Sequence, residues 1–152
     1  MKRHFTTLIL ILFSFPSYCQ FHIDLGGGIT INKQLITKNG VIQKTFPSME
    51  IVAGYVVHSF LIQAEMKPAI TRTSSAPSYF GGAIGFRISN VILTGGYYYN
   101  LISSDDKSLN IWKPGGSLEY CKKLGKKGGI YGKVTYLDNS VVITTGVRIN
   151  II

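Results

Sequence analysis

The sequence of 152 residues has little charge, few cysteines and no long apolar run. Charged residues make up 15% of the chain, against roughly a quarter in typical soluble domains. Glycine, at 17 residues, and aromatic residues, at 12%, are plentiful instead, and the mean hydropathy is +0.21. This balance excludes a disordered, collagenous or coiled-coil chain and disfavours an ordinary charged cytosolic domain. The length suits a single domain.

The apolar run at residues 8–15 is well short of the ~20 residues that a membrane-spanning helix needs. Two basic residues precede this run, and the small side chains of Ser17 and Cys19 occupy the −3 and −1 positions of a cleavage site. Residues 1–19 are therefore predicted to be a secretory signal peptide, and residues 20–152 the mature domain. A lipoprotein acylated on Cys19 is the alternative.

Cysteine is nearly absent from the mature domain, where Cys121 stands alone, so no disulfide within the domain is possible. The formal net charge of the whole chain is +9, and a basic excess can indicate nucleic-acid binding. Four lysines nevertheless gather at one expected turn without any recognition motif: Lys122, Lys123, Lys126 and Lys127. We therefore expect a solvated basic turn and no nucleic-acid partner.

No window of the mature domain shows a helical period. Polar and apolar residues alternate with period two, which is the pattern of β-strands. Turn signals divide this pattern into eight expected strands: 20–32, 48–57, 60–71, 79–89, 91–102, 111–122, 130–137 and 141–151. Each is close to the roughly 9–11 residues with which a tilted strand crosses a bilayer. The predicted fold is all-β, an eight-stranded antiparallel up-and-down transmembrane β-barrel (a meander).

One face of every expected strand carries no charge, and the opposite face carries the charged residues. The charged face consists mostly of small residues with one or two charges per strand, which suits the narrow lumen of an eight-stranded barrel. Buried charges must be paired to be tolerated, so we expect a closed polar interior. The predicted interior salt-bridge network consists of Asp24, Glu50, Glu65, Lys67, Arg87, Glu119, Lys133 and Arg148.

The expected turns determine how this network pairs. A turn at residues 58–59 places Glu50 opposite Lys67 on the next strand. Three further contacts are expected: Glu65 with Arg87, Glu119 diagonally with Lys133, and Asp24 with Arg148 on the strands that close the barrel. A salt-bridged plug is the main interpretation, and an ion or proton pathway is the functional alternative.

Large aromatic residues on the uncharged faces gather near the ends of the expected strands. The ring expected on the side of the chain termini contains Phe21, Tyr55, Phe60, Phe86 and Tyr120, and the ring on the other side contains Phe80, Tyr97, Tyr99, Trp112 and Tyr136. Two aromatic girdles around an apolar band are typical of the two interfaces of a membrane. This pattern favours lipid outside the uncharged faces.

With these features, residues 20–152 resemble the small eight-stranded outer-membrane β-barrel family, of the outer membrane protein A and X type. The C-terminal residues 146–152 resemble a terminal barrel strand, with Ile152 where the family usually ends in phenylalanine. The resemblance implies a monomeric barrel in the Gram-negative outer membrane, with a porin-like fold, no open pore, no cofactor and a structural or surface-interaction role. It also implies contact with outer-membrane lipid and insertion by the barrel-assembly machinery through the C-terminal strand.

Two other functions are compatible with alternating strands. A secreted soluble, lipocalin-like barrel would turn the same strands inside out and bind an apolar ligand. A lipid-modifying outer-membrane enzyme would need a Ser/His pair near the outer leaflet, but His22 and His58 both map to the rim on the side of the termini. The sequence shows neither metal-ligand spacing nor a phosphate-binding loop, so we expect no catalytic activity.

The first connection on the side away from the termini is the best candidate for a specific interaction. Asn39 and Gly40 lie between β-prone runs at residues 34–37 and 41–44, and Asn-Gly in this setting is a strong hairpin signal. We expect the first two strands to project beyond the membrane as a ribbon whose exposed edge could pair with a surface partner. The alternative is a hairpin without a partner.

Overall fold

Alternating polar and apolar residues form strands throughout the described part of the chain. The computed structural model describes residues 19–32, 36–37, 40–41, 44–70, 77–101, 112–137 and 140–151. The strands within these ranges are β1 (Cys19–Asn32), β2 (Ile36–Thr37), β3 (Gly40–Val41), β4 (Lys44–Val57), β5 (Phe60–Lys67), β6 (Ser78–Ile88), β7 (Val91–Leu101), β8 (Trp112–Lys123), β9 (Gly128–Leu137) and β10 (Ser140–Ile151).

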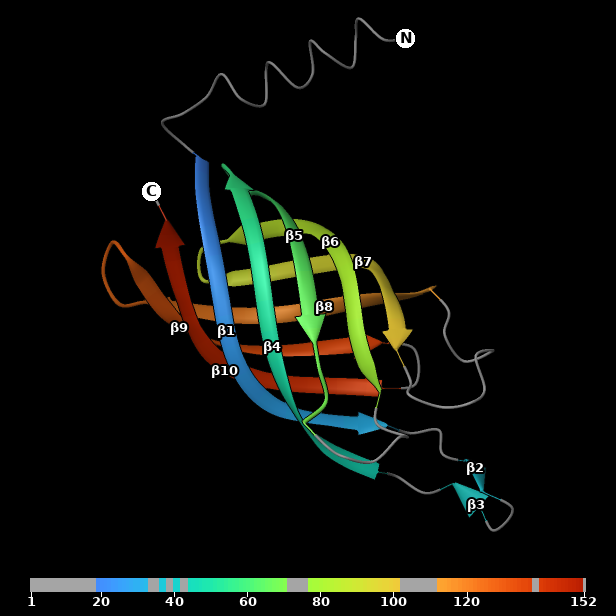
Figure 1. Ribbon diagram of the computed structural model, residues 1–152. Coiled ribbons are helices and arrows are strands. Elements are labelled where there is room, and N and C mark those ends of the chain that lie inside the picture. The colour runs from blue at the N-terminus through green and yellow to red at the C-terminus, as the bar shows by residue number, and fades with distance from the viewer. Residues whose placement is uncertain are drawn as a thin grey trace, which may run out of the picture.

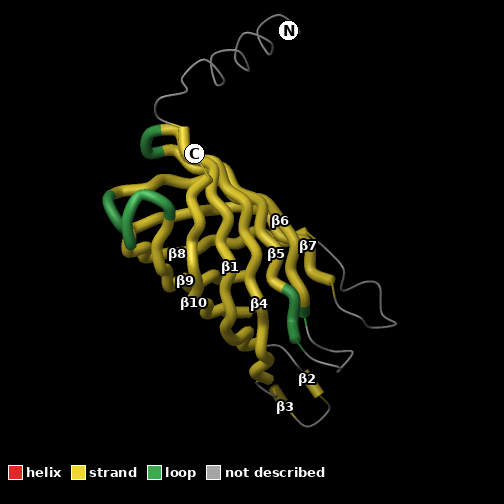
Figure 2. The backbone as a smooth tube through the Cα atoms, turned by 60° about the vertical axis from the view of Figure 1, so that its left-hand side comes forward, coloured by secondary structure: helices red, strands yellow, loops and turns green. Residues whose placement is uncertain are grey.

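Eight of these strands form one closed antiparallel barrel in the order β1-β10-β9-β8-β7-β6-β5-β4 (Figures 1 and 2). Strand β1 closes the barrel against β10, from Phe21↔Ile151 to Asn32↔Ser140. Closure removes the two exposed edges of an open sheet. The predicted eight-stranded up-and-down barrel is confirmed. Within the described ranges, no helix is long and apolar enough to cross a membrane.

The two ends of the barrel differ in their connections. One end, called here the terminal end, carries both termini of the barrel and the turns at residues 58–59, 89–90 and 124–127. His58, Ser89 and Gly125 have positive φ angles of 57°, 58° and 116° in these turns, which permits the tight reversal. The opposite end, called the distal end, carries the small β2–β3 sheet, which Figure 1 shows beyond the ends of β1 and β4.

Strand β5 is shorter than predicted. It ends at Lys67, whereas the alternation of the sequence continues to residue 71. Pro68 follows, and proline has no N–H with which to extend a ladder. Pairing with β4 continues only through an isolated bridge, Ser48↔Ala69.

Strand β4 is longer than predicted, beginning at Lys44 instead of residue 48. It extends because β1 pairs with it as far as Asn32↔Lys44. Pro47 lies inside this strand, where a proline is normally unfavourable. Its carbonyl accepts the N–H of Ile70 at 2.7 Å. The position where other residues carry an N–H faces the same side as this carbonyl, toward β5. The regular ladder with β5 has already ended there, at Ile51↔Met66, so the proline interrupts no ladder hydrogen bond.

The barrel is polar inside and apolar outside. Each of the eight barrel strands exposes large hydrophobic side chains, such as Ile84 at the middle of β6 and Leu93 on β7. Charged side chains are buried in the lumen, between two small apolar clusters. The cluster near the distal end contains Tyr79, Ala83, Tyr98, Leu137 and Val142, and the one near the terminal end contains Val56, Leu61 and Ile92.

Candidate functional site

The buried charges meet in the lumen because each stands at an inward position of its strand. Seven of these side chains are at most 3% exposed: Asp24 on β1, Glu50 on β4, Glu65 and Lys67 on β5, Glu119 on β8, Lys133 on β9 and Arg148 on β10. Charges so deeply buried are tolerated only when they are paired and hydrogen-bonded. All seven have an oppositely charged partner, in two groups, although Glu119 and Lys133 are held by ion pairs without a hydrogen bond of regular geometry.

Four of them form a ring of alternating charge, called here the charge square: Glu50, Lys67, Glu65 and Lys133. Lys67 Nζ contacts one carboxylate oxygen of each glutamate. Lys133 Nζ lies 3.2 Å from Glu50 Oε1 and 3.0 Å from Glu65 Oε1. Two ammonium groups face two carboxylates, so the square is neutral. Because each ammonium bridges both carboxylates, each member has two partners of opposite charge.

Glu50 also accepts hydrogen bonds from neutral donors across the lumen. The Tyr131 hydroxyl donates to Glu50 Oε2 at 2.9 Å, and Thr144 Oγ1 donates to the same oxygen at 2.7 Å. These donors stand on β9 and β10, whereas the Gln63 amide, which donates to Glu65, stands on the strand of Glu65 itself. Glu50 therefore ties β4 to strands on the other side of the closing seam.

The second group, called here the Arg148 triad, consists of Arg148, Asp24 and Glu119. Arg148 donates from Nε to Asp24 Oδ1 at 2.7 Å and from Nη2 to Asp24 Oδ2 at 2.6 Å, a bidentate contact across the β1–β10 seam. The same Nη2 lies 2.7 Å from Glu119 Oε1. His22 is buried beside the triad, with Nε2 3.9 Å from Asp24 Oδ2.

Inward glycines make room for the long side chains. A Cβ atom at Gly54 would lie 2.3 Å from Cε1 of His22, and one at Gly26 would lie 2.3 Å from the hydroxyl oxygen of Tyr131. Both distances are far below van der Waals contact. The lumen therefore holds these large polar residues only because the strand facing each of them has no side chain at that position.

The structure brings most of the predicted network together. Glu50 lies with Lys67 and Asp24 with Arg148, as the turn and the closing seam predict. The expected contact of Glu65 with Arg87 is wrong. Glu65 stands opposite Gly81, six residues or roughly 20 Å along β6 from Arg87, and Arg87 Nε donates to the Ser89 carbonyl at 3.2 Å.

The expected diagonal placement of Glu119 and Lys133 is also wrong. The β8–β9 turn leaves Lys123 opposite Gly129, so the register sets Glu119 directly opposite Lys133. Their side chains nevertheless turn to different groups, Lys133 to the charge square and Glu119 to Arg148. Register determines which backbone positions are neighbours, and the lumen as a whole determines which charges pair.

Three polar residues of the site were not singled out in the sequence, Gln63, Tyr131 and Thr144, and a fourth, His22, was considered only as a catalytic histidine at the rim, whereas it is buried beside Asp24. Each lies on the inward face of its strand, an even number of residues from a charge that was singled out. The period-two alternation therefore contained the signal that would have placed them in the lumen. Among the described residues, no group of three or more His, Cys, Asp or Glu is placed so that it could hold a metal ion.

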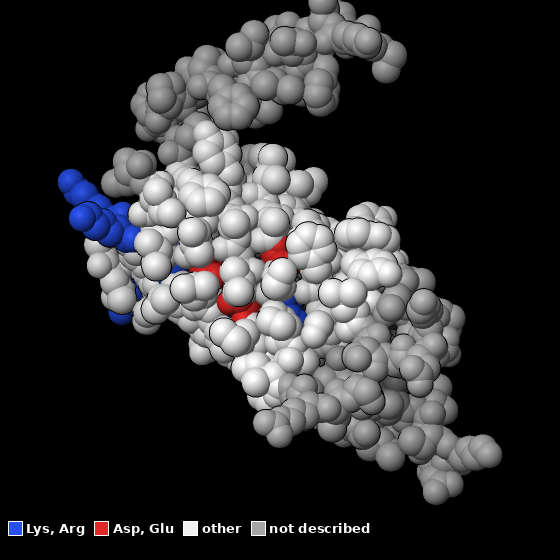
Figure 3. Space-filling view, viewed as in Figure 1, with Lys and Arg blue, Asp and Glu red and all other residues white. Residues whose placement is uncertain are grey.

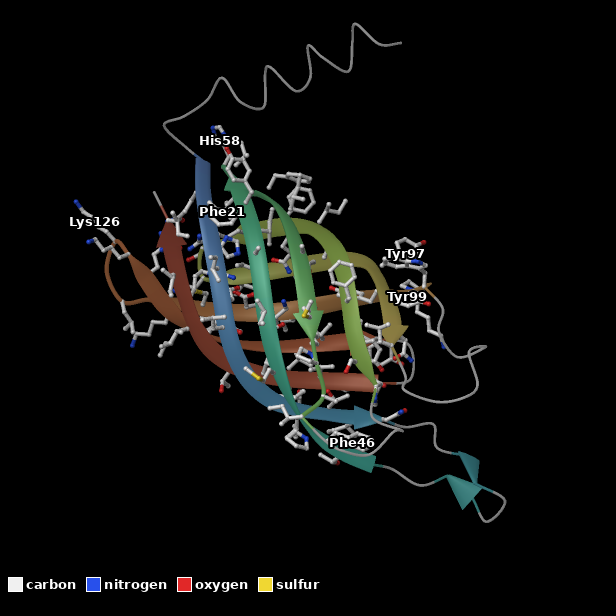
Figure 4. The ribbon with its side chains drawn as sticks, in the orientation of Figure 1. Phe21, Phe46, His58, Tyr97, Tyr99 and Lys126 are labelled. Atoms are coloured by element: carbon white, nitrogen blue, oxygen red, sulfur yellow. The ribbon has the colours of Figure 1, made fainter. Side chains whose placement is uncertain are left out.

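The aromatic residues expected in the girdles stand on the outward faces, near the two ends of the barrel (Figure 4). At the terminal end, Phe60 pairs with Phe86, and their rings meet edge-on with centroids 5.7 Å apart. At the distal end, Tyr99 pairs with Trp112, and the centroids of these rings are 5.5 Å apart. The other members stand on the same faces: Phe21, Tyr55 and Tyr120 toward the terminal end, and Phe80, Tyr97 and Tyr136 toward the distal end.

The expected hairpin is present in part. β2 and β3 pair through Ile36↔Val41 and Thr37↔Gly40. Gly40 is therefore a strand residue and not, as expected, part of the turn, because the paired residues enclose only positions 38 and 39. Asn39 lies outside the described residues.

Comparisons with known proteins support the fold. No protein-family model and no curated protein matches the sequence. A structure from the de novo design of transmembrane β-barrels superposes with a TM-score of 0.52 at 9% identity, over 88% of this chain and 96% of that chain. The crystal structure of Neisserial surface protein A (NspA) superposes with a TM-score of 0.53 at 14% identity, over 85% of this chain and 96% of that chain. At these identities the likeness shows the small eight-stranded barrel fold.

Proposed function

We propose that this chain is an integral outer-membrane β-barrel with a structural or surface-interaction role, without an open pore and without catalytic activity. The observation that carries the proposal is the inverted distribution of side chains. The wall exposes large hydrophobic residues on every strand, and the lumen holds seven buried charges. The closed polar interior and the outward aromatic residues are features that the outer membrane protein A and X type would share.

A wall of this kind is unsuited to water. Contiguous apolar surface beyond a few hundred Å² on a soluble protein is normally an interaction site or an aggregation hazard, and here it surrounds the barrel. Lipid accommodates such a wall, because its tails are themselves apolar. The closed barrel also satisfies its backbone hydrogen bonds internally, as a structure in lipid must. The lipocalin-like alternative needs the opposite arrangement, an apolar lumen and a charged exterior. The buried Glu50, Lys67 and Arg148 therefore speak against it.

The proposal that the barrel is closed to solutes rests on the contents of the lumen. The charge square and the Arg148 triad connect strands across its centre, and a small apolar cluster lies toward each end of the barrel. Moving ions through this layer would require separating charges that are buried and paired with one another. We therefore propose a plug rather than an ion or proton pathway.

Envelope fractionation tests the proposed location. Membranes from cells that make the full chain are separated, and samples with and without boiling are compared on an SDS gel. We expect an outer-membrane band whose mobility changes on boiling, because an inserted barrel resists SDS until it is heated. A band found only in the soluble periplasmic or secreted fraction would overturn the proposal.

A second candidate role, docking of a surface partner, rests on the edge of β4. Beyond the bridge at Ser48 and the hydrogen bond from Ile70 to the Pro47 carbonyl, β4 is paired with β1 as far as Lys44, and residues 44–46 have no ladder on their other side within the described residues. That edge is free to accept an added strand. Deletion of residues 34–44 should abolish cell-surface or partner binding while the boiling-dependent shift persists. Unchanged binding would sink this role.

A further inference from the structure

The turn between β8 and β9 is a strongly basic surface at the terminal end. Lys122, Lys123, Lys126 and Lys127 are all exposed, and Leu124 is exposed between them. Figure 3 shows Lys and Arg atoms protruding at one end of an otherwise largely white wall, and Figure 4 places Lys126 at that end.

This turn is held against the rim of the barrel. The backbone N–H of Asn150 donates to the Lys127 carbonyl at 2.9 Å, and Asn150 Nδ2 donates to the Lys126 carbonyl at 3.4 Å. Leu124 N–H closes the turn on the Gly128 carbonyl at 2.9 Å. The lysines are therefore displayed from a fixed position beside β10.

Lys122 connects the basic turn to the apolar wall. It stands two residues after Tyr120 on the same outward face, which was expected to carry no charge, and Ile130 is its partner in the β8–β9 register. Both of those neighbours are exposed apolar residues of the wall. A lysine at the border of an apolar band keeps its stem on the band and extends its ammonium to the polar interface. The basic surface thus begins at the level where lipid headgroups start.

No carboxylate on the described surface neutralises these lysines. Every Asp and Glu within the described ranges is a member of the buried network: Asp24, Glu50, Glu65 and Glu119. The turn therefore offers four positive charges and one apolar side chain at the edge of the membrane-facing wall. A ligand that matches this surface has an anionic headgroup next to an apolar part.

We propose that the β8–β9 turn binds the phosphate groups of anionic phospholipids at the terminal-end interface. The inference rests on the proposed membrane insertion and adds a preferred lipid to it. A lysine near an anionic surface favours binding roughly fivefold. A single lipid headgroup contacts one or two of the four ammonium groups at a time, so we expect an anionic lipid to be preferred about tenfold over a zwitterionic one at this position.

Quenching by brominated lipids measures this preference. The reporter chain carries Leu124→Trp and Trp112→Phe, so that its single tryptophan lies in the basic turn, and the full chain is refolded into vesicles of equal parts phosphatidylcholine and phosphatidylglycerol. Bromination of one lipid or the other then reports which lipid contacts position 124. We expect the brominated phosphatidylglycerol to quench more, by about tenfold in relative binding.

Two controls separate the possible failures. Changing all four lysines to glutamine in the reporter should bring the two lipids to near-equal quenching, and the unaltered chain, whose tryptophan is at the distal end, gives the reference selectivity. A folded, heat-modifiable barrel with equal quenching at position 124, or a preference that survives the glutamine changes, overturns the lipid inference alone. Failure to insert into either vesicle overturns the membrane proposal, and the lipid inference with it.

Discussion

Replacing Glu50 by alanine tests the charge square at a member with partners on several strands. Glu50 is fully buried and contacts Lys67, Lys133, Tyr131 and Thr144. Its removal leaves two ammonium groups against one carboxylate, so the neutral square acquires a net charge of +1 in the lumen. It also removes the acceptor of two buried hydroxyl groups.

The magnitude follows from what remains paired. Breaking a buried ion pair by removing one partner costs roughly 3–5 kcal/mol, and a buried donor without an acceptor costs roughly 1–3 kcal/mol. Lys67 and Lys133 both keep Glu65 as a partner, which lowers the loss. We therefore expect Glu50→Ala to lower the free energy of unfolding by about 3–4 kcal/mol, a large part of the roughly 5–15 kcal/mol typical of a domain.

Two further variants identify the cause of the loss. Glu50→Gln keeps an oxygen for Tyr131 and Thr144 but removes the charge, so it should cost less than Glu50→Ala. Combining Glu50→Gln with Lys67→Met leaves one ammonium and one carboxylate and restores neutrality. The double variant should be more stable than the sum of the two single losses predicts, by about 1 kcal/mol or more.

The assay is denaturant unfolding of the refolded barrel in detergent or vesicles, followed by the fluorescence of Trp112 and by the boiling-dependent mobility. An unchanged midpoint for Glu50→Ala would refute the pairing of Glu50 with Lys67 and Lys133. Strictly additive losses in the double variant would show that the charges of the square are not coupled.

Three other substitutions test the architecture by the same unfolding assay. A Cβ at Gly28 would lie 1.9 Å from the Ile143 carbonyl oxygen, whereas one at Gly27 meets nothing within 4 Å. Gly28→Ala should therefore lower the free energy of unfolding by about 1–3 kcal/mol. Gly27→Ala, the matched control, should stay within about 0.5 kcal/mol of the parent. Ile84→Arg places a charge on the middle of the wall and should cost roughly 2–4 kcal/mol in vesicles; no loss there would contradict lipid contact at this position. Arg148→Lys keeps the charge but loses the fork that binds the β1 carboxylate, so it should cost about 1–2 kcal/mol, and equal stability would show that the bidentate geometry is unimportant.

The sequence was sufficient for two contacts between neighbouring strands, whereas the contact of Glu65 with Arg87 and the diagonal placement of Glu119 and Lys133 were wrong because the register of their strands was misjudged. Turn residues at positions 58–59 determine the β4–β5 register, and the register places Glu50 near Lys67. The seam contact of Asp24 with Arg148 follows in the same way from closure of the barrel. These contacts are local in the sheet, so alternation and turn spacing determine them.

The contacts that the sequence could not predict cross the lumen. Lys133 lies opposite Glu119 in the sheet but pairs with Glu50 and Glu65. That choice depends on where the neighbouring strands place their glycines and on the strength of Arg148 as a partner for Glu119. No property of β8 and β9 alone contains this information, because the curvature of the barrel decides which distant side chains meet.

The orientation of the barrel follows from side-chain volume as well as polarity. Alternation alone is compatible with either face inward, but an eight-stranded lumen has room for its own side chains and at most one small ligand. The polar face meets this limit by combining large residues with glycine, as at His22 beside Gly54. The apolar face instead carries large residues at successive positions, such as Leu93 on β7 and Leu118 directly opposite on β8. Turned inward, that face would overfill the lumen while exposing paired charges to solvent, so packing and electrostatics favour the same orientation.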